Sequence, residues 1–92
     1  MKPVIISQHA KTRASQRGAA ENEIYECIVE SQHEHVEKSR LSARKIYSYN
    51  DLSPINNKFY QYKTVEVIFI EEAESITVIT VKVFYSNRGE EL

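Results

Sequence analysis

The sequence predicts an α+β domain in which two N-terminal helices pack on one face of a three- or four-stranded antiparallel sheet. Three observations support this fold class. Apolar residues first recur with a helical period, they then alternate as in strands, and turn-forming segments separate the alternating runs. With 92 residues, 41% of them hydrophobic and 27% charged, the chain has the length and composition of one folded domain over residues 1–92.

Two helices are expected, over residues 8–17 and 21–31. Ser7 stands where an N-cap would begin the first helix, and Gly18 stands where a left-handed residue would end it. The buried edge of the second helix combines apolar residues three and four positions apart, namely Ile24, Cys27 and Ile28. Because Cys27 is the only cysteine, no intrachain disulfide can form, and we expect a small core residue.

Three strands are expected, over residues 44–50, 59–70 and 76–85. All three are rich in β-branched and aromatic residues, and the segments "NDLSPINN" and "EEAES" between them have the polarity of turns. The side chains predicted to be buried between helices and sheet are Ile24, Ile28, Val65, Val67, Ile79, Val81 and Val83.

The first helix carries three basic side chains four residues apart, His9, Arg13 and Arg17, which we call the basic stripe. On a helical wheel this stripe borders Ala10 and Ala14, the only surface that the helix can bury. The guanidinium groups would then lie at the mouth of the helix–sheet seam, where each can donate two hydrogen bonds to a phosphate. In the alternative interpretation, the arginines pair with Glu21, Glu23 or Glu66 and only brace the helix.

A second candidate feature is the sheet face that the helices would leave free. If the valine-rich faces pack on the helices, the free face would present aromatic rings beside cations, on which unpaired RNA bases can stack. The residues assigned to this platform are Arg44, Lys45, Tyr47, Tyr49, Tyr60, Tyr62 and Lys82. The strand propensity of tyrosine explains the same pattern without any function, and the sequence leaves both interpretations open.

Several other functions find no support in the sequence. His33 and His35 lack further spaced ligands, so no metal site is expected, and without a glycine-rich phosphate loop no cofactor is expected either. No apolar run has the ~20 residues of a membrane span, and the start "MKPVIISQHA" is not a secretory signal, so a cytoplasmic protein is expected. The net charge is only −1, but residues 1–20 contain no acid, which directs any anion site to the first helix.

The segments "SQHAKTRASQRG" and "VITVKVFY" resemble the small bacterial proteins of domain-of-unknown-function family 4258. Its pattern Ser-x-His-Ala-x-x-Arg-x-x-x-Arg-Gly is matched by Ser7, His9, Ala10, Arg13, Arg17 and Gly18, and its last strand is approximated by Val78, Ile79, Thr80 and Val81. That family is grouped with RelE, barnase and colicin-type ribonucleases, so the resemblance implies a RelE/barnase-like fold. Two departures are Ala19 and Ala20, where the family has an aliphatic and a capping residue, and Lys82, where it has tyrosine.

Residues and resemblance together predict a metal-independent endoribonuclease of the toxin type that acts on single-stranded RNA. The RNA 2′-hydroxyl would attack the adjacent phosphate, His9 would move a proton, and Arg13 and Arg17 would stabilise the developing charge. Thr80 would bond a phosphate oxygen, and Glu66 is a remote candidate for the second proton carrier. Two alternatives remain: a non-catalytic RNA-binding module, and an interaction protein whose last strand pairs with a second copy or with an antitoxin protein.

Overall fold

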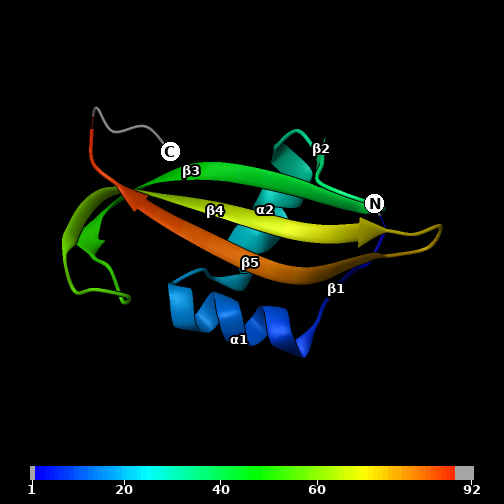
Figure 1. Ribbon diagram of the computed structural model, residues 1–92, viewed down its shortest axis with the longest axis horizontal. Coiled ribbons are helices and arrows are strands. Elements are labelled where there is room, and N and C mark those ends of the chain that lie inside the picture. Colours follow the sequence, from blue (N-terminus) through cyan, green and yellow to red (C-terminus); the bar gives the residue numbers. More distant parts are fainter. Residues whose placement is uncertain (1, 89–92) are drawn as a thin grey trace.

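The computed structural model describes residues 2–88 and contains two helices and one five-stranded sheet. The elements are β1 (Val4–Ile6), α1 (Gln8–Arg17), α2 (Glu21–Glu30), β2 (Glu34–His35), β3 (Arg40–Leu52), β4 (Phe59–Glu71) and β5 (Ile76–Ser86). The strand order across the sheet is β1-β5-β4-β3-β2. Helix α2 crosses behind the sheet, whereas α1 runs along its edge beside β5 (Figure 1).

The α+β class and the two N-terminal helices are confirmed, but the predicted three- or four-stranded antiparallel sheet is wrong. The sheet has five strands and is mixed, because β1 pairs in parallel with β5. Ile76 N donates to Pro3 O at 2.9 Å and Ser7 N donates to Val78 O at 3.2 Å, which joins the two ends of the chain. Strands of three and two residues are too short to show alternation, so neither β1 nor β2 could be predicted from the sequence pattern.

The ends of α1 follow from two local residues. Ser7 Oγ accepts a hydrogen bond from Ala10 N at 3.1 Å, as an N-cap side chain does. Gly18 adopts a φ of 90° and its N–H donates to Ala14 O at 2.9 Å, which ends the helix in the left-handed conformation. Ala10 and Ala14 are buried and allow α1 to approach β5 closely.

The register of β3, β4 and β5 assigns the two faces of the sheet. The rows that face the helices are Ala43–Val67–Val81, Lys45–Val65–Val83 and Tyr47–Lys63–Tyr85. The rows on the opposite face, which we call the open face, are Ser42–Ile68–Thr80, Arg44–Glu66–Lys82, Ile46–Thr64–Phe84 and Ser48–Tyr62–Ser86. The predicted burial of Val65, Val67, Val81 and Val83 is confirmed, as is that of Ile24 and Ile28 on α2.

One predicted core residue, Ile79, is only partly buried. The pairing of β4 with β5 shifts between Ile68 and Phe69, so that Ile68 lies opposite Thr80 but Phe69 lies opposite Val78. A β-bulge inserts one residue and reverses the alternation beyond it. Val78 therefore points into the core with no exposed surface, in place of Ile79.

Gly18 provides a direct test of how the helices join the sheet. A Cβ atom at this position would lie 2.4 Å from the Tyr85 hydroxyl oxygen and 3.0 Å from Pro54 Cγ, in a backbone conformation that costs an L-residue about 1–2 kcal/mol. We expect Gly18→Ala to lower the free energy of unfolding, measured by urea denaturation, by about 2–3 kcal/mol. The exposed Ser15→Ala on α1 should change it by less than about 0.5 kcal/mol, and equal effects of the two variants would contradict this role of Gly18.

Candidate nucleic-acid interface

The basic stripe lies on α1 beside Ala10 and Ala14, the residues that the helix buries. His9 is exposed and Arg13 and Arg17 are half-buried. Arg17 reaches the strand itself, because its Nη1 donates to Val81 O at 2.8 Å. The burial of Ala10 and Ala14 and the contact of Arg17 with β5 agree with the expected arrangement, whereas the hydrogen bond of Arg13 is to Gln16 of its own helix.

The arginines of the stripe are not braced by acids. Within residues 2–88, neither Arg13 nor Arg17 forms an ion pair; Arg13 Nη1 contacts Gln16 Oε1 at 3.2 Å instead. Two of the three acids considered as partners are engaged elsewhere, Glu23 with Lys63 at 2.9 Å and Glu66 with Arg44 at 2.8 Å, and the third, Glu21, forms no ion pair within residues 2–88. Within residues 2–88, only one of the five N–H donors of the Arg17 guanidinium is bonded, the one to Val81 O.

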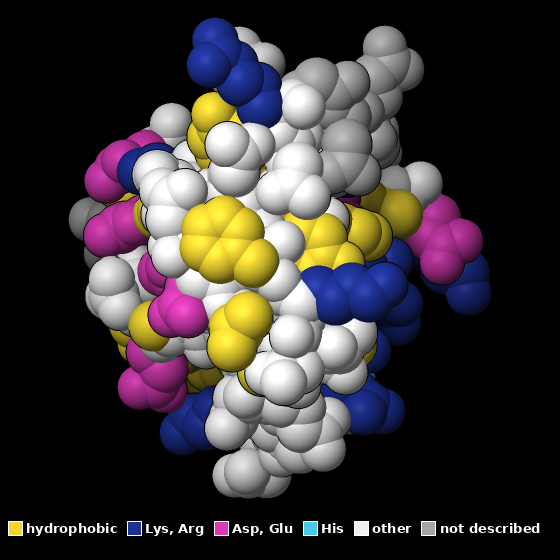
Figure 2. Space-filling model, turned by 90° about the vertical axis from the view of Figure 1, so that its left-hand side faces the viewer, with side chains coloured by type: hydrophobic (Ala, Val, Ile, Leu, Met, Phe, Trp, Pro, Cys, Tyr) yellow, Lys and Arg dark blue, Asp and Glu magenta, His cyan; other side chains and the backbone are white. Residues whose placement is uncertain are grey.

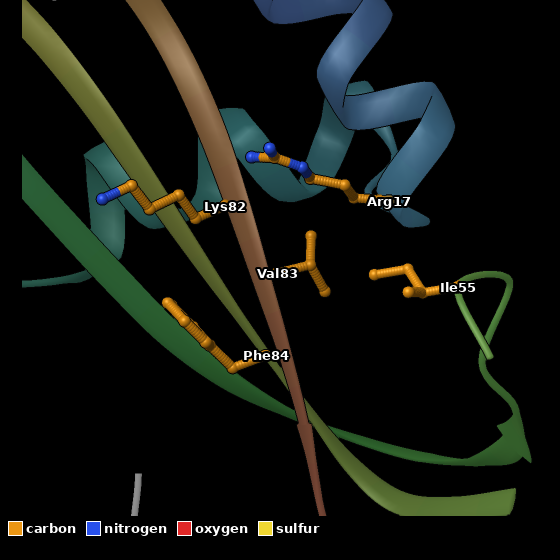
Figure 3. Close-up of a pocket in the computed structure, with 5 residues that line it drawn as sticks. All are labelled: Arg17, Ile55, Lys82, Val83 and Phe84. Carbon is orange, nitrogen blue, oxygen red and sulfur yellow. The ribbon is translucent and has the colours of Figure 1, made fainter. Parts of the chain in front are cut away.

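A pocket of about 260 Å³ opens at the edge of β5 next to Arg17. Its lining residues are Arg17, Ile55, Lys82, Val83 and Phe84 (Figure 3). Arg17 and Ile55 approach the strand on the side to which Val83 points, and Lys82 and Phe84 extend from the other side. The pocket therefore straddles the strand edge and brings Lys82, a predicted RNA-binding residue, to the same edge as Arg17.

Thr80 lies on the other side of β5 from the stripe. It is half-buried on the open face, opposite Ile68. Lys82, two residues further along β5, lies on the same face. A ligand that contacts both Thr80 and Arg17 would have to pass around the edge of the strand. Glu66, the remote candidate for a second proton carrier, faces the same side, and its side chain is only 12% exposed in the ion pair with Arg44.

The predicted tyrosine platform is largely wrong. In β3, the register pairs Lys45 with Val65 and Tyr47 with Lys63, so these β3 side chains face the helices. Lys45 contacts the carboxylates of Glu26 and Glu30, and the Tyr47 hydroxyl donates to Glu26 Oε1 at 2.7 Å. The pattern of β3 alone could not reveal this, because polar residues occur on both of its faces.

Lys63 is the centre of an internal cluster at the junction of α1 and α2. Its side chain is only 8% exposed, and Nζ donates to Gly18 O at 3.0 Å and to Glu23 Oε1 at 2.9 Å. The same Nζ lies 5.8 Å from the ring centre of Tyr47 and 5.4 Å from that of Tyr49. These rings stabilise a buried cation inside the protein and do not form a free stacking surface.

Two further tyrosine rings extend this cluster. The Tyr85 hydroxyl donates to Arg17 O at 2.6 Å, and the Tyr85 ring centre lies 5.2 Å from that of Tyr49 and 5.7 Å from that of Tyr60. Burial raises the pKa of Tyr85 to about 12 and also raises the pKa of Tyr47, so both hydroxyls remain protonated donors at neutral pH. Tyr60, which was assigned to the platform, contacts the Tyr85 ring, and its hydroxyl accepts a hydrogen bond from Asn56 Nδ2 at 2.9 Å.

Three of the seven platform residues do lie on the open face: Arg44, Tyr62 and Lys82. Arg44 is 53% exposed but is paired with Glu66. In the next row of the open face, Ile46 and Phe84 are exposed, whereas Thr64 between them is fully buried. The Thr64 hydroxyl has no hydrogen-bond partner within residues 2–88. Side chains thus close over the centre of this face. Its exposed cations are Arg44 on β3, which is paired with Glu66, and Lys82 on β5.

Cys27 is a core residue, as expected. It is fully buried, its Sγ donates to Val65 O at 3.4 Å, and burial raises the pKa of its thiol to about 11. A protonated, inaccessible thiol is not a nucleophile at neutral pH. In the part of the chain from residue 2 to residue 88, no three His, Cys, Asp or Glu side chains converge as metal ligands would.

Sequence reasoning missed Ile55, Val83 and Phe84 as parts of one surface pocket. The alternation of the last run does indicate that Phe84 and Lys82 share a face, but only the fold brings the 53–58 loop to the end of α1. Figure 2 views this end of the molecule and shows hydrophobic side chains at its centre, with acidic side chains gathered to the left and a basic group to the right. Leu52, Ile55 and Phe59 are the large apolar residues exposed near the loop.

These features define the class of the protein: an α+β protein with two N-terminal helices, a mixed five-stranded sheet and a cationic seam beside β5. No family model, curated protein or solved structure matches the chain. Neither helix in residues 2–88 has the length and apolar character needed to cross a bilayer.

Proposed function

We propose that this protein is a metal-independent endoribonuclease of the toxin type, with a RelE/barnase-like fold, that acts on single-stranded RNA at the α1–β5 seam. The observation that carries the proposal is the state of Arg13 and Arg17. In residues 2–88 both are without carboxylate partners, as are Lys11 on α1 and Lys82 on β5, whereas Lys2, Arg44, Lys45 and Lys63 are paired. Guanidinium groups held at a seam without acids are suited to bind phosphate.

The proposed reaction uses the RNA's own 2′-hydroxyl. Its oxygen forms a bond to the adjacent phosphorus while the bond to the 5′-oxygen of the next nucleotide breaks. His9 accepts the proton of the 2′-hydroxyl, and the leaving 5′-oxygen takes up a proton, which gives a 2′,3′-cyclic phosphate and a 5′-hydroxyl. Arg13 and Arg17 stabilise the charge that develops on the phosphate oxygens. Within residues 2–88 the exposed ring of His9 has no hydrogen-bond partner, so it is available to substrate.

The arginines are tested by the salt dependence of RNA binding. We expect Arg13→Ala and Arg17→Ala each to weaken binding of single-stranded RNA and to reduce the slope of log affinity against log salt by about 0.7, the value for one lost phosphate contact. Arg17→Ala should also lower the melting temperature, because it removes the bond to Val81 O. Binding is measured by fluorescence anisotropy between 50 and 200 mM salt.

Arg40→Ala is the matched control, since Arg40 is exposed at the start of β3, on the far side of the sheet from β5. Its binding curve and salt slope should equal those of the wild type. If Arg13→Ala and Arg17→Ala also leave both quantities unchanged, the seam does not bind RNA and the proposal fails. Binding that depends on both arginines without any cleavage would favour the non-catalytic RNA-binding module.

A further inference from the structure

Within residues 2–88, no strand pairs with the outer edge of β5 beyond Val78. β1 pairs only with residues 76–78, and Arg17 covers the carbonyl of Val81. Main-chain groups alternate in direction along a strand, so the N–H and C=O of Val83 and Tyr85 point to the same outer side as those of Val81. Within residues 2–88, no group from outside the sheet bonds to the main chain of Val83.

The pocket of about 260 Å³ lies along this open segment. On the helix side, the Val83 side chain stands between Arg17 and Ile55, and Ile55 is 58% exposed (Figure 3). A strand that paired with Val83 would direct one side chain into this apolar pocket and its two neighbours to the opposite side, beside Lys82 and Phe84. The edge thus combines unpaired main-chain groups with a pocket for a single side chain, the two elements of recognition by strand addition.

The charge of this edge decides between occupants. Neither α1 nor β5 contains an acidic residue, and Arg17 and Lys82 flank the open segment on its two sides. A second copy that paired edge to edge would bring like charges together, which is unfavourable across a strand pair. A segment with carboxylates would neutralise them.

We propose that the edge of β5 from Val83 to Tyr85 binds an extended acidic segment of another protein as an additional strand. An apolar side chain opposite Val83 occupies the pocket against Ile55. An acidic neighbour, which points to the other face, pairs with Lys82, and an acidic residue two positions away, on the same face as the apolar side chain, pairs with Arg17. This inference does not depend on RNA cleavage, because it follows from the unpaired edge and its charge.

Selection of twelve-residue peptides from a random phage-displayed library against the whole protein tests the proposal. The expected peptides carry an apolar residue with acidic residues one and two positions away and, once bound, slow hydrogen exchange of the Val83 and Tyr85 amides at least about tenfold, as one protecting hydrogen bond would. The amides of Lys82 and Phe84 point to β4 and should be protected already in the free protein. Selection of basic peptides, or of none, would overturn the proposal.

Val83→Pro is the matched variant, because it deletes an N–H that points away from β4 and removes no bond of the sheet. Affinity for the selected peptides should fall at least about tenfold, while the far-ultraviolet spectrum stays that of the wild type. Two other results would contradict an acidic protein partner: a wild-type dimer that Val83→Pro dissociates, and protection of the Val83 amide by single-stranded RNA in place of peptide. If Val83→Pro does not fold, the exchange measurement on the wild type alone decides.

Discussion

His9→Ala should reduce the rate of RNA cleavage at least about 100-fold, the usual contribution of a positioned proton acceptor. The affinity for RNA should stay close to that of the wild type, because Arg13 and Arg17 supply the phosphate contacts. Stability should also be unchanged, since His9 is exposed and in residues 2–88 nothing bonds to its ring. The cleavage rate is measured in single-turnover reactions with a fluorescent single-stranded RNA, with protein in excess.

The matched control is His35→Ala, which removes an exposed histidine from β2, the edge of the sheet farthest from β5. It should cleave RNA at the wild-type rate. Equal activity of wild type and His9→Ala would exclude His9 as the proton acceptor. A parallel loss of activity in His35→Ala would show that the loss does not come from the α1–β5 seam.

Lys63→Met should lower the free energy of unfolding by about 3 kcal/mol, because removal of one partner of a buried ion pair leaves the other charge uncompensated. The Lys63 and Glu23 side chains are 8% and 15% exposed, and Lys63 also bonds to Gly18 O. The substitution therefore removes the contact that links β4 to both helices. Urea denaturation followed by circular dichroism measures the loss.

Lys58→Met, at an exposed position of the 53–58 loop, is the control and should change the unfolding free energy by less than about 0.5 kcal/mol. The double variant Lys63→Met/Glu23→Gln should be less destabilised than the sum of the single variants, since the two side chains interact directly. Additive effects, or a loss of under about 1 kcal/mol in Lys63→Met, would mean that the pair does not hold the helices on the sheet.

The local signals of the sequence predicted the helices and the three long strands. Ser7, Gly18 and the apolar edge of α2 act within a few residues, so their patterns correspond directly to structure. The three long strands extend beyond their predicted limits by at most four residues, in β3. β1 was missed because its partner, β5, is far away in the sequence, and β2 was missed because two residues are too few to show alternation.

The candidate site was predicted in part. The α1 stripe lies where its spacing placed it, but the tyrosines of β3 face the helices, since pairing with Val65 and Lys63 fixes their side of the sheet. A lysine in a strand suggests exposure, and only the tertiary structure shows that Glu23, Gly18 and two rings surround Lys63. Likewise, the bulge that buries Val78 depends on the pairing of two strands and has no local signal in either.

Metal-independent cleavage at the seam is tested most directly by incubating the wild-type protein with mixed-sequence single-stranded RNA in excess EDTA and identifying the ends of the products. We expect fragments with a 2′,3′-cyclic phosphate and a 5′-hydroxyl, and no cleavage of the same RNA carrying 2′-O-methyl groups, because the attacking 2′-hydroxyl is then blocked. RNA that remains intact, or cleavage of the methylated RNA, would contradict the proposed function.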